Sequence, residues 1–250
     1  MSSLTPLRRV DPLFPVVWTG GEEERTYPAQ WAALRELPSL PGLGRAHAQG
    51  LLSDAALQAA LRHRVSRLGM TSLPAELLRV IYELAGASFT GAHFCWHPSS
   101  TSAAQTQRLL PEGVVLKTVT VCLGGKMLMW SSLGEDSLVE RRLLHHVAHH
   151  LGLSRRLLRH TSLNPVGWNA VRLYGVEPGM VSPLVKRRVR PLDAVVTLWP
   201  PSPIKSQAAI SLSLFESLLL PVADLRELLR AYASRVYPQV RYLELEGTRW

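Results

Sequence analysis

The sequence predicts an α+β protein with a mixed, mainly antiparallel sheet or small barrel surrounded by helices. From about residue 90 onward, short β-branched runs are interspersed with segments of helical periodicity. The pair Gly124-Gly125 lies between two apolar runs, as in a two-residue hairpin. The composition, with 46% hydrophobic and 19% charged residues, excludes wholesale disorder. We therefore expect one large domain or a domain with an extension.

The first 50 residues are expected to form a proline-rich, extended arm that lies on a surface. Their prolines prevent long helices, while the apolar residues Leu4, Phe14, Trp18 and Trp31 favour burial. The prolines are Pro6, Pro12, Pro15, Pro28, Pro38 and Pro41.

Residues 51–87 are expected to be a helical segment. Ser53 and Asp54 are typical of a helix start, and the helix should end near Gly69. A second helix should begin at Ser72 and stop near Gly86.

Residues 88–250 carry the remaining elements of the predicted domain. A Ser or a Pro stands at the start of each expected helix, where Ser can cap the helix and Pro suits the first turn. The expected strands are 93–97, 114–123, 127–131, 193–198, 208–214 and 240–245, and the expected helices are 100–110, 137–152, 165–175 and 222–233.

Positive charge is concentrated in one fifth of the chain. Residues 141–190 hold ten Lys and Arg against Glu177 alone, a net charge of +9 that equals that of the whole chain. Such a face suits phosphate contacts, because each neutralised phosphate releases counterions. A solvated basic surface without a partner is the alternative. The residues expected to contact RNA are Arg141, Arg142, Arg155, Arg156, Arg159, Lys186, Arg187, Arg188 and Arg190.

Two separated segments together predict a pocket. The strand 114–123 contains Lys117, and a buried strand rarely accepts an ammonium unless that group is partnered or functional. The loop 174–184 is rich in Gly and Pro and can bring backbone amides up to a ligand. Alternatively, Lys117 extends its ammonium into solvent from an edge strand and the loop is simply a turn.

The Lys117-Thr118 pair, the segment Leu151-Gly152-Leu153 after a helix and the loop Gly179 to Pro183 resemble one family. The chain from about residue 90 to 245 is similar to the YbaK family of aminoacyl-tRNA deacylases, which is related to the editing domain of bacterial prolyl-tRNA synthetase.

The resemblance implies hydrolysis of mischarged aminoacyl-tRNA by a positioned water. Lys117 would orient the terminal nucleotide or the ester, beside Thr118, and Gly179 would offer its backbone N–H. The loop residues Met180, Val181, Ser182 and Pro183 would line the substrate. An activated ester needs no strong nucleophile if amides and a cation stabilise the developing oxyanion.

The chain departs from the family pattern in two places. Family members carry a glycine-rich strand before the last helix, whereas residues 210–217 contain no glycine, and the usual Gly-Asp turn survives only loosely in residues 131–136. The pocket therefore either accepts a different substrate or has lost catalysis. The second hypothesis is a catalytically inactive, RNA-binding component of a ribonucleoprotein, such as a ribosome or its assembly intermediate. Whether the chain is an enzyme stays open at this point.

Four histidines lie in i, i+4 pairs between residues 145 and 150. On a helical wheel they fall outside the apolar stripe, and no Glu completes an HExxH arrangement. We expect this face to meet water or RNA phosphate, with no metal and no cofactor.

The remaining expectations concern partners and compartment. Tryptophans such as Trp130 could stack on bases, although core packing is the commoner role. Cys95 and Cys122 lack metal-ligand spacing, which favours a reducing compartment. No apolar run is long enough to span a membrane. We expect a cytoplasmic protein or, alternatively, a mitochondrial or other organellar matrix protein. Its partners would be tRNA or other RNA, with a ribonucleoprotein or synthetase docking on residues 1–50.

Overall fold

The computed structural model describes residues 40–67, 78–80, 93–97, 100–133, 141–163, 181–184, 192–200, 207–212 and 216–246. The strands are β1 (His93–Trp96), β2 (Gly113–Leu123), β3 (Lys126–Leu133), β4 (Thr161–Leu163), β5 (Ala194–Trp199), β6 (Gln207–Ser211), β7 (Glu216–Pro221) and β8 (Arg241–Glu246). The helices are α3 (Leu40–Ala48), α4 (Asp54–Arg67), α6 (Ala103–Leu109), α7 (Arg141–His150) and α9 (Val222–Val236), with a 3-10 helix η1 (Arg155–His160).

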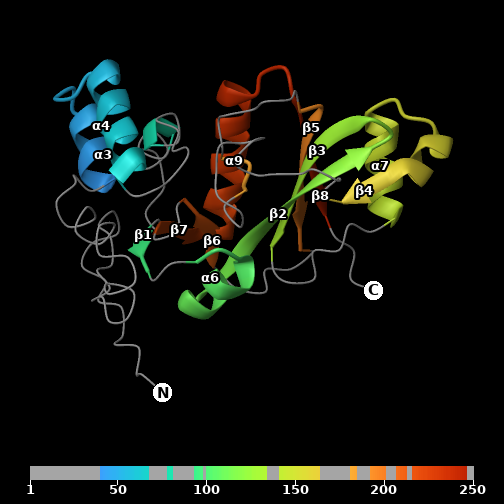
Figure 1. Cartoon of the computed structure of the whole chain (residues 1–250), viewed down its shortest axis with the longest axis horizontal. Coiled ribbons are helices and arrows are strands. Elements are labelled where there is room, and N and C mark those ends of the chain that lie inside the picture. The colour runs from blue at the N-terminus through green and yellow to red at the C-terminus, as the bar shows by residue number, and fades with distance from the viewer. Residues whose placement is uncertain are drawn as a thin grey trace.

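The described strands form one eight-stranded mixed sheet in the order β1-β7-β6-β2-β3-β5-β8, with β4 paired to β2 beside this path. Four of the seven strand pairings are antiparallel: β1 with β7, β6 with β7, and β2 with both β3 and β4. The other three, β2 with β6, β3 with β5, and β5 with β8, are parallel. The predicted α+β class with a mixed, mainly antiparallel sheet is confirmed (Figure 1).

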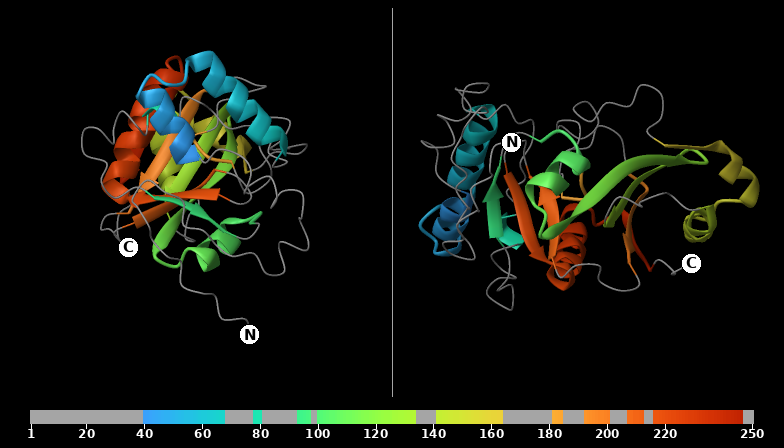
Figure 2. Two further views of the ribbon diagram at one scale, coloured as in Figure 1. Left: turned by 90° about the vertical axis from the view of Figure 1, so that its left-hand side faces the viewer. Right: turned by 90° about the horizontal axis from the view of Figure 1, so that it is seen from below.

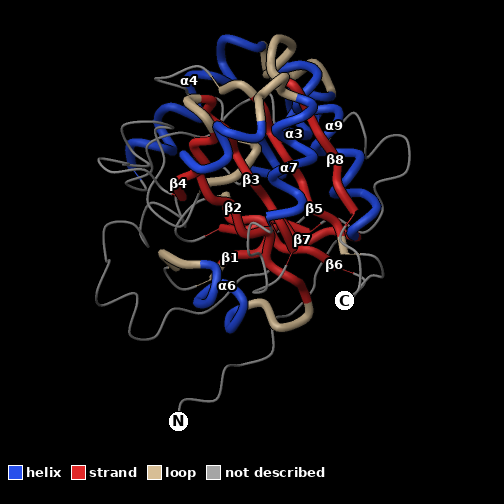
Figure 3. The backbone as a smooth tube through the Cα atoms, turned by 90° about the vertical axis from the view of Figure 1, so that its right-hand side faces the viewer, coloured by secondary structure: helices blue, strands red, loops and turns tan. Residues whose placement is uncertain are grey.

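Helices cover both faces of the sheet. Strand alternation puts Met129 of β3 in the apolar core that includes Leu225 and Leu228 of α9. The next residue, Trp130, belongs to a second core with Val147 of α7. Neighbouring residues of one strand point to opposite faces, so α9 and α7 pack on opposite sides of β3. Further views show α9 and the α3–α4 pair along one side of the strands (Figures 2 and 3).

Local signals account for most of these elements. Ser53 Oγ accepts a hydrogen bond from the Ala56 amide at 3.3 Å, which caps α4 where the sequence predicts a helix start. Ser102 caps α6 in the same way through the Gln105 amide at 3.2 Å. Gly152, with φ of 69°, follows α7 in the left-handed conformation that ends many helices.

Some elements differ from the sequence-based expectation. Helix α3 occupies the end of the range expected to be an extended arm, because Pro41 lies in its first turn, where the missing N–H costs nothing. Residues 1–39 lie outside the described residues, as do most of the second expected helix (72–86) and the helix expected at 165–175. Strands β4 and β7 and the helix η1 were not predicted.

No helix in the described part of the chain is both long and apolar enough to cross a membrane. Cys95 is buried and Cys122 is half-buried, and neither forms a disulfide.

Candidate active site

The candidate site lies where strand β2 passes from one half of the sheet to the other. On the side of β2 away from β3, residues 113–115 pair with β6 and residues 121–123 pair with β4. Of the five residues between these pairings, Thr120 has an interaction of its own, and residues 116–119 have no strand partner on that side within the described ranges. We call this interval the split. Figure 1 shows β2 running from β6 toward β4 and α7 across it.

The hairpin geometry determines which backbone groups face the split. Gly124 and Gly125 have φ of 56° and 85°, as a two-residue type I′ turn requires. The residues flanking such a turn, Leu123 and Lys126, form a hydrogen-bonded pair. Backbone direction alternates along β2, so the N–H and C=O of every second residue, including Lys117, point toward β3. The N–H and C=O of Thr118 point the other way, into the split.

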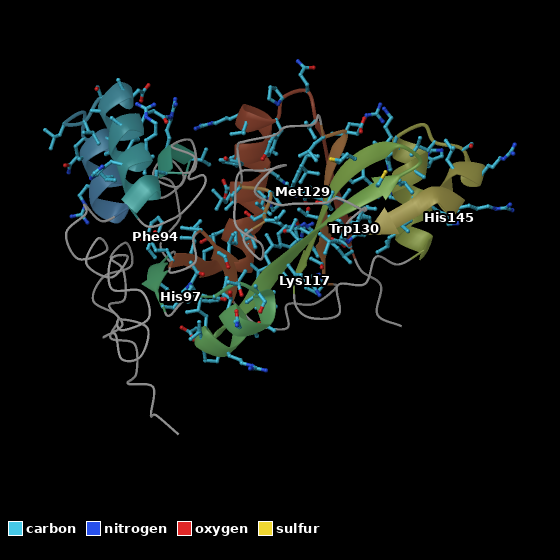
Figure 4. The ribbon with its side chains drawn as sticks, in the orientation of Figure 1. Phe94, His97, Lys117, Met129, Trp130 and His145 are labelled. Carbon is cyan, nitrogen blue, oxygen red and sulfur yellow. The ribbon has the colours of Figure 1, made fainter. Side chains whose placement is uncertain are left out.

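Side chains of β2 alternate across the split. Lys117 is exposed, and its ammonium has no hydrogen-bond or ion-pair partner among the described residues. Thr118 is half-buried on the opposite face, and its Oγ1 lies 2.8 Å from Ser131 Oγ. In Figure 4, Lys117 lies on β2 between His97 near one end of the molecule and His145 near the other. Lys117 and Thr118 therefore approach the split from two faces of one strand.

The described part of the predicted loop packs in the core on the Thr118 face. Val181 and Leu184 belong to the same apolar core as Leu116, two residues before Thr118. Ser182 and Pro183 are buried, and Ser182 Oγ accepts a hydrogen bond from the Leu184 amide at 3.3 Å. Gly179 and Met180 lie outside the described residues.

A row of polar side chains crosses the sheet from Thr118, and only Thr118 itself was predicted from the sequence. The register aligns Thr118 with Ser131, Ser131 with Thr197, and Thr197 with Glu244. Ser131 and Thr197 are buried. Thr197 Oγ1 donates to Tyr242 Oη at 3.2 Å. A polar residue inside an otherwise apolar strand was the available signal, but the strand order needed to align the row is not visible in the sequence.

Electrostatics at the far end of this row are set by two arginines. Partial burial would raise the pKa of Glu244, but hydrogen bonds and charge from Arg230 and Arg226 outweigh it, so the pKa is lowered. Burial is also the main reason that the pKa of Tyr242 is raised to about 12.

The basic residues divide between described and undescribed segments. Arg156 and Arg159 are exposed on η1, and the backbones of Arg141, Arg142 and Arg155 lie in α7 and η1. All four histidines of α7 are exposed. The other residues expected to contact RNA, Lys186, Arg187, Arg188 and Arg190, lie outside the described residues. No group of three or more His, Cys, Asp or Glu in the described ranges is arranged to hold a metal ion.

The α+β class with a mixed sheet is shown by the chain's own strands and helices, and comparison with known proteins adds no family to it. No family model matches the sequence, and no curated protein matches it. Two solved structures each cover 71% of this chain and 100% of their own at 13% identity. One is a scaffold protein from the computational grafting of epitope backbones, with a TM-score of 0.41. The other is described as a candidate trans-editing enzyme for prolyl-tRNA synthetase, with a TM-score of 0.42. Likeness at this level carries no inference about activity.

Proposed function

We propose that this protein hydrolyses the ester of mischarged aminoacyl-tRNA with a positioned water in the split of β2. The observation that carries the proposal is the interval at residues 116–119, where β2 lacks a strand partner between β6 and β4 within the described ranges. The backbone N–H and C=O of Thr118, which point into this interval, are available to a ligand instead of a neighbouring strand. The Lys117-Thr118 pair, on which the resemblance to aminoacyl-tRNA deacylases depends, lies in this interval.

The chemistry follows from the groups around the split. The Thr118 N–H can donate to an ester carbonyl or to the oxyanion that forms from it, and the Thr118 C=O can accept from the attacking water. Since no strand among the described residues closes this edge, the Lys117 ammonium can reach it on its flexible stem and stabilise negative charge. Positioning water against an activated ester then needs no serine or cysteine nucleophile.

The test is hydrolysis of a panel of mischarged tRNAs by the wild-type protein and by Lys117→Ala. We expect turnover of at least one ester, lowered about 100- to 1000-fold by the substitution, as for the loss of an oxyanion-stabilising donor. Lys126→Ala is the matched control, because Lys126 is an exposed lysine of the same hairpin that pairs with Asp193 at 2.9 Å. Equal activity of Lys117→Ala and Lys126→Ala would refute the role of Lys117.

A second candidate function, RNA binding without catalysis, is favoured by the charge of residues 141–163. This described segment contains five arginines and five histidines and no Asp or Glu. We expect the double substitution Arg156→Glu and Arg159→Glu to weaken RNA binding and to reduce its salt dependence. RNA binding by a folded wild-type protein that hydrolyses no ester in the panel would favour this second function over the first.

A further inference from the structure

Helix α7 carries two imidazoles whose nitrogen atoms converge. His146 Nε2 and His150 Nε2 are 3.0 Å apart, and the two ring centroids are 4.5 Å apart. Both side chains are exposed, so an ion in solution can reach them. The i, i+4 spacing explains why they share a helix face. The spacing alone did not indicate a metal site, but the convergence of the two nitrogens adds a geometric observation.

The separation of the two nitrogens matches one coordination geometry better than another. Imidazole nitrogens bind first-row metals at about 2.0–2.1 Å. Two such ligands at a right angle are roughly 2.9 Å apart, and at the tetrahedral angle roughly 3.3 Å apart. The observed 3.0 Å is closer to the right-angle value, which is typical of square-planar or tetragonal Cu²⁺ and Ni²⁺.

We propose that the imidazoles of His146 and His150 together chelate a divalent first-row metal ion, Cu²⁺ in particular, on the exposed face of α7. Cu²⁺ is favoured because it has the highest affinity for nitrogen ligands in the divalent first-row series. Segment 141–163 itself offers no carboxylate, so water can take the positions that the two imidazoles leave open. The site needs neither the split nor Lys117, so it is independent of the proposed function.

A neighbouring pair on the same helix provides the control. His145 and His149 are also four residues apart and exposed, but the close nitrogen contact joins His146 and His150. The ring of His149 meets that of His150 edge-on with centroids 6.1 Å apart, farther than the 4.5 Å of the proposed pair. His149→Ala therefore removes an exposed imidazole from α7 and leaves the chelating pair intact.

The experiment is calorimetric titration of the full chain with CuCl₂ in a non-chelating buffer, with electron paramagnetic resonance of the bound ion. We expect the wild type and His149→Ala to bind one ion with equal affinity and a signal from two nitrogen ligands. His146→Ala removes a direct metal ligand, so it should weaken copper binding by at least as much as the loss of an outer-shell partner, which is roughly 10- to 100-fold. All three side chains are exposed, so equal thermal melts should verify that the variants fold.

Two results would overturn the proposal. One is equal weakening by His149→Ala and His146→Ala, which would indicate binding spread over the histidines. The other is wild-type affinity no greater than that of the double variant His146→Ala with His150→Ala. In that case the 3.0 Å contact is only an N–H···N hydrogen bond between neutral rings.

Discussion

Alkaline pH should destabilise the fold through the phenol of Tyr242. This side chain is half-buried on strand β8, and its Oη accepts a hydrogen bond from Thr197 Oγ1 at 3.2 Å. Burial raises the pKa of Tyr242 from 10.0 to about 12, with a further contribution from the negative charge of Glu244. The folded state thus holds the phenol proton more tightly than the unfolded chain does.

The sign and size of the effect follow from proton linkage. A folded pKa above the unfolded pKa contributes stability that is complete below pH 10 and is lost as the pH rises through 12. Each unit of pKa shift corresponds to about 1.4 kcal/mol, so the full effect is about 2–3 kcal/mol. About half of it, roughly 1.4 kcal/mol, should be lost by pH 11.

The assay is urea unfolding of the wild type and Tyr242→Phe at pH 9 and pH 11. Phe lacks the titrating group, so the difference in unfolding free energy between wild type and variant should shift by roughly 1.4 kcal/mol against the wild type between the two pH values. Other groups that titrate in this range affect both proteins alike and cancel. A constant difference would contradict the predicted shift, and so would ultraviolet absorbance that shows Tyr242 ionising together with exposed phenols.

Three further predictions concern the sheet and its edge contacts. Gly113→Ala should lower the unfolding free energy by about 1–3 kcal/mol, because a Cβ there would lie 2.5 Å from Leu219 Cδ1 in a buried site. Chemical denaturation would measure this loss, and an unchanged unfolding midpoint would contradict the described packing around Gly113. Gly125→Ala should lower the unfolding free energy by about 1–2 kcal/mol through the φ of 85° alone, since nothing lies within 4 Å of the added Cβ. Gly125→Asn is the control, and it should lower the unfolding free energy by less. Glu244→Gln should make the unfolding free energy depend less on pH in the acid range. The lowered pKa of Glu244 contributes stability above its unfolded pKa, near 4.5, and this stability is lost as the pH falls through the folded pKa. An unchanged acid unfolding midpoint would argue against the contacts of Glu244 with Arg230 and Arg226.

Local chemistry explains which elements were predictable from the sequence. The Gly124-Gly125 turn was predicted because the type I′ turn needs positive φ at both residues. The start of α9 was predicted because proline is favoured where a helix begins, and Pro221 is the N-cap residue of α9. Strand β7 was missed because its Leu-rich run lacks β-branched residues, and its pairing with β6 and β1 overrides that weak preference. Strand β4 has three residues and exists through its pairing with β2.

The candidate site was predictable only in part, because local sequence signals mark its residues but not the strand pairings that bring them together. Lys117 and Thr118 were singled out because a charged residue interrupts a β-branched run. The register that brings Ser131, Thr197 and Glu244 into line with Thr118 depends on strands far apart in the chain, which no local pattern encodes. The same is true of the split, because it is defined by where β6 and β4 stop pairing with β2.

The shared strand β2 also has a consequence for how the molecule assembles. The β2–β3 hairpin joins neighbours in sequence and can form in microseconds. The pairing of Gly113 with Gln207 must instead bring together residues 94 positions apart in the sequence, which costs chain entropy before any contact offsets it. We therefore expect the half of the sheet containing β6, β7 and β1 to dock late on a preformed hairpin. The split would be completed at that last step, and amide hydrogens beside it should exchange sooner than those inside the hairpin.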